Sequence, residues 1–585
     1  MMNKFFTALL LLSFFIVSRL HAQLPASADK TAWFREARLG LFIHWGLFAQ
    51  QAGIYQQKRY YGISEWLQFR AAIPVTDYEK IAQQFNPTAF DAEEWVRMAK
   101  NSGFRYIVIT AKHHEGFAMF QSMVSAFNIV DATPYKKDPL KALATACEKE
   151  GIKLGFYYSQ FQDWHEPNGG GNHWDFDESK KNYQQYYASK SIPQIKELLT
   201  HYGNIGLIWF DTPGNMNADD SRKFMEEVRK LQPNCLISSR VGNGLGDYID
   251  FGDGEIPHGI VKKPWEAIFT HNDSWGFSSF DHNFKSPSEV IRLLCTIASK
   301  GGNLLINVGP DATGRIPRPS VDYFRIMGEW LQKNGESIYS TTYGPLKPQP
   351  WGAITRKENR LYLHVFERPA NGRLLIPTQQ LKIQKAYFLD GKKSLRYAPT
   401  PEGVELLLPA ELPDPRVSVI TLELKEPLEE AFSLPEQISR QHQSFSILPD
   451  FAAFTGNAKV ENVTFSHYFG DWKYATSIGQ LKDSSDAAIF TLRFREPGDY
   501  KISLEYSADK KSEGKEGLLD INGKPFYFQV LYTGERDVWK PALFLKHTVS
   551  VFTATASETV TLKIRPLQNG QELFKLKRIL IEPID

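Results

Sequence analysis

Asp211 closes a short apolar run, residues 205–211 (IGLIWFD), and its carboxylate is placed to do chemistry. A β-branched run of this length is typical of a buried parallel strand. In an α/β barrel the carboxyl end of such a strand lies where catalysis occurs. The alternative is that Asp211 only caps the helix that follows it.

Further carboxylates follow along the chain and could partner Asp211. Hydrolysis of a glycosidic bond needs two carboxyl groups, one that attacks or activates water and one that protonates the leaving oxygen. Spacing alone does not choose the second group. The candidates are Asp247, Asp250, Asp253, Glu255 and Glu266.

Short apolar runs alternate with segments of helical period from residue 39 to residue 333, and these elements must position the carboxylates. The predicted strands are residues 39–45, 105–110, 154–158, 205–211, 235–240, 247–253, 265–270 and 303–308. Eight strands that alternate with helices predict an α/β fold with a (β/α)8, TIM-like barrel. A doubly wound sheet is the alternative, but no glycine-rich turn follows the first strand. Asp91 is placed to begin one of the helices, and Gly151 to end another.

The chain of 585 residues is too long for one hydrophobic core, and its pattern changes past Tyr343. We expect a signal peptide at residues 1–22, the barrel at 30–343, a small antiparallel β-sandwich at 344–426, a linker at 427–446 and a C-terminal β-sandwich or jelly roll at 447–585. The last domain is either a carbohydrate-binding module or a structural appendage. Trp472, Tyr474 and Trp539 could form a stacking platform there or fill its core.

Composition and the N-terminal residues limit the kinds of partner and the cellular compartment that we expect for this protein. A net charge of +2 without long blocks of like charge argues against a nucleic-acid partner. Lys4 precedes an apolar run at residues 5–17, which predicts a cleavable signal and therefore an exported protein, periplasmic or extracellular. A membrane anchor is the alternative, but the run is shorter than the ~20 residues that a span requires. The three cysteines lie in apolar patterns without the spacing of metal ligands, and we expect no disulfide framework.

Ten short motifs follow one another along the barrel segment, from about residue 33 to residue 343. They are FIHWG (42–46), EW (65–66), KHHEGF (112–117), YYS (157–159), WFD (209–211), SR (239–240), GDY (246–248) with Glu255 downstream, WE (265–266), SWGF (274–277) and GGNLLINVGP (301–310). Together they resemble the α-L-fucosidases of glycoside hydrolase family 29. The C-terminal domain lies outside this resemblance.

The resemblance implies an exo-acting, retaining hydrolase that releases terminal L-fucose from a fucosylated oligosaccharide or glycoconjugate, with no cofactor. It assigns Asp211 as the nucleophile that forms a covalent fucosyl-enzyme, and Glu255 as the acid/base. Glu266 and then Asp253 are the alternatives for the acid/base. In a retaining enzyme the two carboxyl groups lie about 5–5.5 Å apart.

Other polar and aromatic residues at predicted strand ends could contact the sugar. Fucose carries a methyl group at C6, so part of its site must be apolar, and Phe117 is one further candidate for this wall. The histidines could instead bind zinc. Adjacent residues of a strand point to opposite faces, however, so we expect no metal site. The predicted substrate-binding residues are His44, Trp45, Glu65, Trp66, His113, His114, Tyr158, Trp209, Arg240 and Trp275.

Two residues depart from the pattern of many relatives, namely Glu115 in place of Asp and Thr212 in place of Gly. The first should matter little if its side chain only braces the histidines, whereas the second could alter linkage preference. Two other functions stay open, a different barrel glycosidase of galactoside or substrate-assisted type and a non-catalytic glycan-binding protein.

Overall fold

The computed structural model describes residues 29–431, 435–438, 440, 444–466, 472–535, 542–555 and 557–584. The predicted signal peptide at 1–22 and Trp539 lie outside these residues. Among the helices in the described ranges, none combines the length and the apolar content needed to cross a bilayer.

An eight-stranded parallel sheet forms the first part of the chain, in the order β7-β6-β5-β4-β1-β10-β9-β8. A parallel bridge between Ser238 and Tyr248 joins the edge strands β7 and β8, and the Ser239 N–H donates to the Tyr248 carbonyl at 3.1 Å. The sheet therefore closes on itself, and the prediction of a TIM-like barrel is confirmed. Its strands are β1 (Leu39–Ile43), β4 (Tyr106–Lys112), β5 (Lys153–Ser159), β6 (Leu207–Asp211), β7 (Leu236–Ile237), β8 (Ile249–Asp250), β9 (Trp265–Thr270) and β10 (Asn303–Val308).

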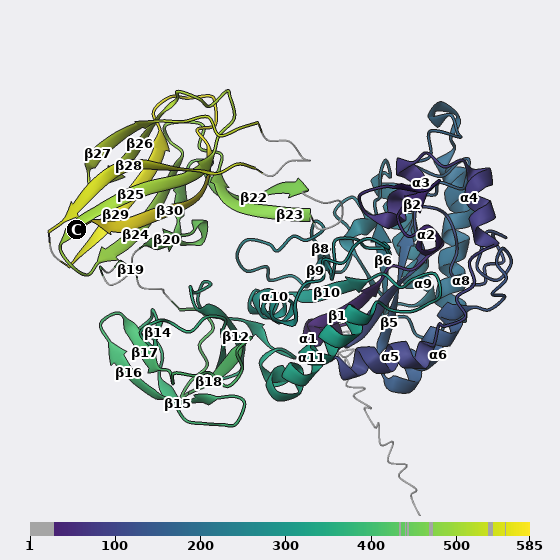
Figure 1. Cartoon of the computed structure of the whole chain (residues 1–585), viewed down its shortest axis with the longest axis horizontal. Coiled ribbons are helices and arrows are strands. Elements are labelled where there is room, and N and C mark those ends of the chain that lie inside the picture. Colours follow the sequence, from purple (N-terminus) through teal and green to yellow (C-terminus); the bar gives the residue numbers. More distant parts are fainter. Residues whose placement is uncertain are drawn as a thin grey trace, which may run out of the picture.

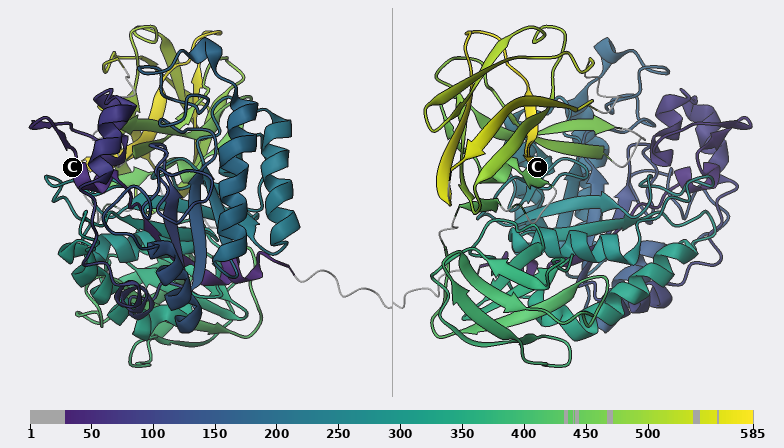
Figure 2. Two further views of the ribbon diagram at one scale, coloured as in Figure 1. Left: turned by 90° about the vertical axis from the view of Figure 1, so that its right-hand side faces the viewer. Right: turned by 60° about the vertical axis from the view of Figure 1, so that its left-hand side comes forward.

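Helices cover the outside of this barrel (Figures 1 and 2). The Asp91 side chain caps the first of them by accepting from the Glu94 N–H at 2.9 Å, and Gly151 ends the second in the left-handed conformation, both as predicted. The main helices are α5 (Ala92–Asn101), α6 (Pro139–Glu150), α8 (Ile192–His201), α9 (Ala218–Leu231), α10 (Pro287–Ser299) and α11 (Arg318–Asn334).

Asp211 does not cap the helix that follows β6. Asn217 caps α9, where its side chain accepts from the N–H groups of Asp219 and Asp220. The Asp211 carboxylate is therefore available at the carboxyl end of the barrel.

Two antiparallel sheets follow the barrel and enclose a core of their own. They pack against α10 and α11: the Arg292 guanidinium donates to the Phe366 carbonyl at 2.6 Å and the Trp330 indole N–H to the Val417 carbonyl at 2.8 Å. The strands are β11 (Thr342–Tyr343), β12 (Gly352–Lys357), β13 (Arg360–Val365), β18 (Ser418–Leu424) and β15 (Ile383–Phe388) in one sheet, and β14 (Arg373–Ile376), β17 (Gly403–Leu407) and β16 (Arg396–Thr400) in the other.

The C-terminal region is a second pair of sheets around a separate apolar core. β19 lies within the expected linker and pairs with β24 of this region. β20 begins at the end of that linker and pairs with β30. One sheet contains β19 (Glu436–Ile438), β21 (Ala453–Thr455), β24 (Ala487–Phe494), β26 (Glu516–Ile521), β27 (Lys524–Gln529) and β29 (Glu558–Pro566), and the other β20 (Phe445–Ile447), β22 (Lys459–Ser466), β23 (Trp472–Gly479), β25 (Gly498–Ser507), β28 (Leu545–Ala554) and β30 (Lys575–Ile584). The β22–β23 hairpin extends from this sandwich toward the barrel near β8 (Figure 1).

Candidate active site

A cavity of about 240 Å³ opens among the carboxyl ends of the barrel strands and the loops that follow them. This volume is slightly below the range of about 300–1,000 Å³ of ligand pockets and suits a single sugar ring. Its walls combine carboxylates, imidazoles and aromatic rings. The lining residues are Phe42, His44, Ile63, Glu65, Trp66, Arg70, His113, His114, Tyr157, Trp209, Asp211, Thr212, Arg240, Asp253, Ile268 and Trp275.

The Asp211 carboxylate lies in this cavity with two hydrogen-bond donors. The Tyr157 hydroxyl donates to Oδ2 at 2.8 Å and the Arg240 guanidinium to Oδ1 at 3.1 Å. Burial alone would raise the pKa of Asp211, but Arg240 and Tyr157 stabilise the charged form and hold that pKa below its ordinary value. Asp211 is therefore an anion at neutral pH, as a nucleophile must be.

Arg240 brings a second carboxylate to the cavity. Its Nη2 donates to Asp253 Oδ1 at 2.5 Å and to the Phe251 carbonyl at 2.9 Å, while its Nη1 binds Asp211. Asp250 accepts from the Nε of the same side chain at 3.2 Å, but it lies behind the cavity wall, where burial raises its pKa to about 7. One guanidinium thus holds Asp211 and Asp253 close together, and both line the cavity.

Glu255 and Glu266, the first two choices for the acid/base from sequence, do not line the cavity. Glu255 lies two residues beyond Asp253 on the same loop, and its Oε1 accepts from the Asn462 amide of β22 at 3.1 Å. Glu266 is buried deeper in the barrel, where it accepts from the Tyr106 hydroxyl at 2.5 Å and from the Trp209 indole N–H at 3.1 Å. Asp253 and Glu255 lie in different surroundings because the loop turns at Gly254 between them, whose φ is 74°.

His44 and His114 present neutral imidazoles, because burial lowers the pKa of His44 to about 3 and that of His114 well below 6.5. His44 Nδ1 lies 2.7 Å from Asn307 Oδ1; the Asn307 amide donates to the Trp275 carbonyl, so the imidazole must be the donor. The Ser159 hydroxyl donates to the Gln162 carbonyl and therefore accepts from His114 Nδ1 at 2.7 Å. His44 keeps Nε2 as an acceptor for a sugar hydroxyl, whereas His114 Nε2 lies 3.5 Å from Asp211 Oδ2.

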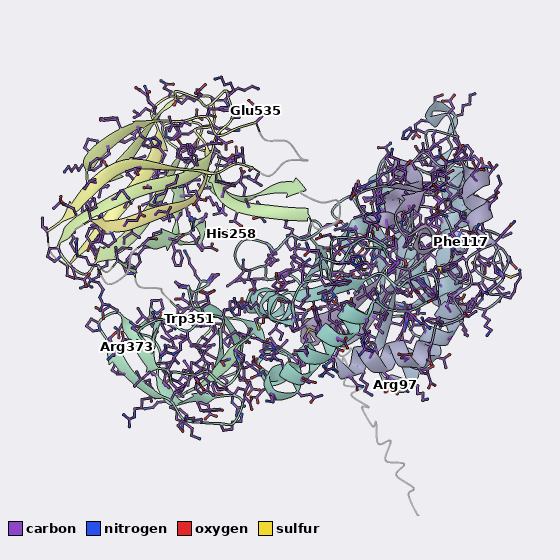
Figure 3. The ribbon with its side chains drawn as sticks, viewed as in Figure 1. Arg97, Phe117, His258, Trp351, Arg373 and Glu535 are labelled. Carbon is purple, nitrogen blue, oxygen red and sulfur yellow. The ribbon has the colours of Figure 1, made fainter. Side chains whose placement is uncertain are left out.

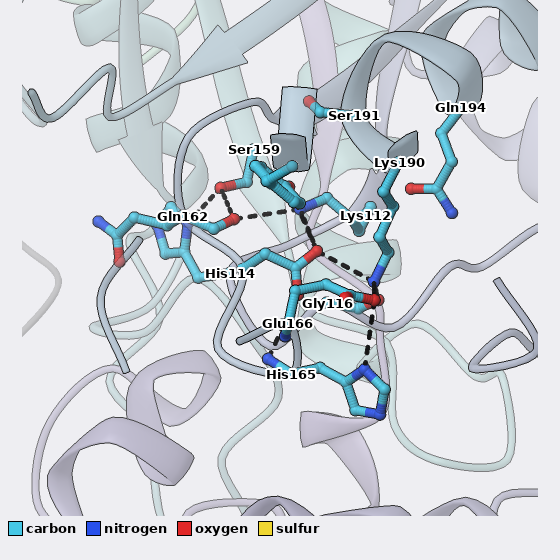
Figure 4. Close-up of polar contacts among 12 residues, drawn as sticks. Lys112, His114, Gly116, Ser159, Gln162, His165, Glu166, Lys190, Ser191 and Gln194 are labelled. Atoms are coloured by element: carbon cyan, nitrogen blue, oxygen red, sulfur yellow. Dashed lines mark hydrogen bonds and ion pairs between the residues drawn. The ribbon is translucent and has the colours of Figure 1, made fainter. Parts of the chain in front are cut away.

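A buried ion-pair network supports the loop behind His114 (Figure 4). Asp163 binds the ammonium groups of Lys112 and Lys190, each at 3.1 Å, and Lys112 also donates to the Gln162 carbonyl. These contacts fix the carbonyl that orients Ser159, and through it the His114 ring.

Both His113 and His114 face the cavity, although the expected alternation of a strand would separate them. The pairing of β4 with β5 shifts between Thr110 and Lys112, and β4 ends at Lys112. The two histidines therefore follow the strand, where alternation no longer holds. Among the described residues, no three His, Cys, Asp or Glu side chains are grouped as ligands for a metal ion.

Tyr157, which the sequence did not single out, lies where Tyr158 was expected. Tyr157 pairs with Trp209 in the β5–β6 register, and the two rings stack with centroids 5.4 Å apart. Tyr158 points the other way and donates to Gln194 Oε1 at 2.8 Å among the outer helices. Because side chains alternate along a strand, the two tyrosines must face opposite sides of the barrel wall, and inspection of this alternation relative to Asp211 could have identified Tyr157.

This pair of tyrosines offers a matched test. Tyr157→Phe should lower kcat/KM by about 10-fold to 100-fold, because Asp211 loses a charge-assisted hydrogen bond worth about 1.5–3 kcal/mol. Tyr158→Phe should leave kcat/KM within about two-fold and lower only the melting temperature, since it strands the buried Gln194 amide. Steady-state kinetics and thermal unfolding of both variants check this, and equal kinetic losses would contradict it.

Trp45 and Phe117 do not reach the cavity either. Trp45 is fully buried against Phe90 and Trp95, and its indole N–H donates to the Asp311 carbonyl at 3.0 Å. Phe117 is fully buried within the barrel half of the molecule (Figure 3). The apolar part of the cavity wall is supplied instead by Phe42, Ile63, Trp66, Trp209, Ile268 and Trp275.

Glu115 is buried beneath the histidines, with its Oε2 3.5 Å from His113 Nδ1. Burial raises the pKa of Glu115 to about 8. Between its unfolded pKa of about 4.3 and this native value, the folded protein binds more protons at this site than the unfolded chain. The free energy of unfolding therefore falls as the pH rises through this window.

Glu115→Gln should remove this contribution. We expect the variant to lose less stability than the wild type between pH 5 and about pH 8.5, so that its advantage in denaturation midpoint grows with pH. Urea unfolding at several pH values measures this slope. A slope identical to that of the wild type would show that Glu115 is ionised in the native protein. Part of the slope should persist, because burial also raises the pKa of Glu65 to about 7.

The sequence and the structure of this chain are similar to those of known proteins. The family model described as alpha-L-fucosidase matches residues 21–336. Human plasma alpha-L-fucosidase is 29% identical over 372 residues, which cover 59% of this chain and 78% of that protein. The crystal structure of an alpha-L-fucosidase from Vibrio sp. strain EJY3 is 30% identical and covers 95% of this chain and 98% of its own, with a TM-score of 0.79.

A third relative, the alpha-L-fucosidase AlfC from Lactobacillus casei in complex with alpha-L-fucose, is 42% identical over 53% of this chain and 99% of its own, with a TM-score of 0.51. The match to AlfC covers about half of this chain, whereas the match to the Vibrio enzyme extends over nearly all of it. The chain therefore belongs to the alpha-L-fucosidase family of glycoside hydrolases.

Proposed function

We propose that this glycoside hydrolase is an exo-acting, retaining α-L-fucosidase in which Asp211 is the nucleophile and Asp253 the acid/base. The observation that carries the proposal is the pair of carboxylates bound by one Arg240 guanidinium in a cavity of monosaccharide size. Asp253 replaces Glu255, the first choice from sequence, because Asp253 lines the cavity whereas Glu255 is bound to Asn462.

In the first step the Asp211 carboxylate attacks C1 of the fucosyl residue while Asp253 protonates the departing glycosidic oxygen. A covalent fucosyl-enzyme and a free alcohol result. In the second step Asp253, now a carboxylate, takes a proton from water, and the resulting oxygen nucleophile displaces Asp211. Two inversions at C1 give net retention.

Arg240 and Tyr157 set the charge of the nucleophile during this cycle. Both donate to Asp211, and they stabilise its anionic form before attack and as it leaves. The neutral His44 would bind a ring hydroxyl through its Nε2 atom, while the His114 ring lies beside the nucleophile, with its Nε2 3.5 Å from Asp211 Oδ2. The aromatic and aliphatic side chains of the wall would lie against the C6 methyl of fucose, where a galactoside would bury an unpaired hydroxyl at a cost.

Proton NMR of the reaction with 4-nitrophenyl α-L-fucoside tests the proposal. The first product should be the α anomer of fucose, and the β-galactoside and α-galactoside analogues should react far more slowly. Initial release of the β anomer would overturn retention. Turnover of a galactoside at an equal rate would overturn the assigned sugar.

We also propose that the enzyme acts outside the cytoplasm. Lys4 and the apolar run at residues 5–17 support this, as they are typical of a cleaved secretory signal. Intact mass of the protein purified from its native host tests the point, and a mature chain that retains residues 1–22 would contradict it.

A further inference from the structure

The loop that carries Asp253 is held from the inside by the barrel. Arg240 binds the Asp253 carboxylate and the Phe251 carbonyl, and the Gly254 N–H donates to the Ile268 carbonyl of β9 at 2.9 Å. These contacts fix one face of the loop only.

The other face is held by the β22–β23 hairpin of the C-terminal sandwich. The Asn462 amide donates to Glu255 Oε1 at 3.1 Å and to the Ile256 carbonyl at 3.3 Å. Across the hairpin, the Thr476 hydroxyl donates to Asn462 Oδ1 at 3.0 Å and so orients the amide toward the loop. Glu255 in turn accepts from the Gly252 N–H at 3.0 Å, which ties the ends of the turn around Asp253 together.

Gly252 shows how closely the hairpin approaches. A Cβ atom on this residue would lie 2.4 Å from the Tyr474 hydroxyl oxygen, so a larger side chain would have to displace the Tyr474 side chain or the loop. Beyond the turn, His258 Nδ1 lies 3.5 Å from Asp450 Oδ1 of the same sandwich, in the gap between the domains (Figure 3). The contact therefore extends along the loop on both sides of Asp253.

We propose that the β22–β23 hairpin is part of the catalytic apparatus, with Asn462 and Tyr474 as positioning residues that hold the Asp253 loop and so place its carboxyl group against the leaving oxygen. This inference rests on the proposed function. It gives the C-terminal domain a role in acid/base catalysis that differs from glycan capture. Two glycines flank Asp253, so the loop is flexible in itself and needs this outer support.

Substrates whose leaving groups differ in basicity distinguish positioning of the acid by the hairpin from a general loss of structure. A misplaced acid slows only reactions in which the leaving oxygen needs a proton. Asn462→Ala should lower kcat/KM about 10-fold or more for a fucosyl disaccharide, and about two-fold or less for 2,4-dinitrophenyl α-L-fucoside. Thr476→Val and Tyr474→Phe, which each remove one hydroxyl, should show the same selectivity with smaller losses. Tyr527→Phe, at an exposed tyrosine of β27 in the same sandwich, is the matched control.

A double-mutant cycle completes the test. In the Asp253→Asn background, Asn462→Ala should have no further effect on the disaccharide, because no acid is left to position. Equal losses on both substrates, or additive effects in the cycle, would overturn the inference and leave the proposed function intact. A wild-type protein that releases fucose from neither substrate would overturn both. If Asn462→Ala does not fold, the Thr476→Val and Tyr474→Phe variants give the same readout.

Discussion

Replacing Asp211 by alanine should reduce kcat/KM for an activated aryl fucoside by at least about 1,000-fold, equivalent to about 4 kcal/mol of transition-state stabilisation. The reason is that the variant lacks the atom that bonds to C1, and none of the other lining residues holds a carboxylate where Tyr157 and Arg240 converge. Steady-state hydrolysis of 4-nitrophenyl α-L-fucoside measures the loss. A variant that retained more than about a hundredth of the wild-type rate would show that Asp211 is not the nucleophile.

Azide provides the control for this variant. A small anion can enter the space left by the carboxylate and attack C1 directly, so added azide should partly restore the rate and yield β-fucosyl azide. Asp211→Asn keeps the shape of the side chain without its charge, although the amide can accept from only one of Tyr157 and Arg240, and the variant should be as inactive as the alanine variant. Full activity of Asp211→Asn would mean that the carboxylate only positions the substrate.

Asp253→Asn should cause the second largest loss, and that loss should depend on the leaving group. For a fucosyl disaccharide we expect about a 100-fold to 10,000-fold decrease in kcat/KM, the usual contribution of a general acid. For 2,4-dinitrophenyl α-L-fucoside, whose leaving group needs no proton, the formation of the fucosyl-enzyme should be nearly unchanged and its hydrolysis should become rate-limiting. Pre-steady-state release of the phenol would then appear as a burst.

Glu255→Gln is the matched control for Asp253. Its amide keeps the shape of the side chain but can accept from only one of Asn462 and Gly252, so the loss should resemble that of Asn462→Ala and stay small beside that of Asp253→Asn. Azide should react with the fucosyl-enzyme of Asp253→Asn to give α-fucosyl azide, the opposite anomer from that formed by the Asp211 variant. The reverse pattern, a large loss at Glu255 and a small one at Asp253, would restore the assignment made from sequence.

Local sequence patterns were enough to predict the barrel, the place of Asp211 within it and the family of the chain. Each of these depends on local patterns. Apolar runs and helical periods define the alternating elements, and a residue at the carboxyl end of a parallel strand can only lie at the catalytic rim. Trp209 and Asp211 reached the cavity for this reason, because the alternation of a short strand fixes which face each side chain takes.

The positions of residues that follow strands or lie on loops could be read only from the folded chain. Asp253 and Glu255 are two residues apart, and only the turn at Gly254 and the contacts of Arg240 and Asn462 separate the carboxylate that lines the cavity from the one that does not. Likewise, the break in β4 pairing placed both His113 and His114 in the cavity. The docking of a hairpin about 200 residues downstream in the chain onto the acid-bearing loop has no local signature, because contacts between distant segments form only once the domains have folded and packed.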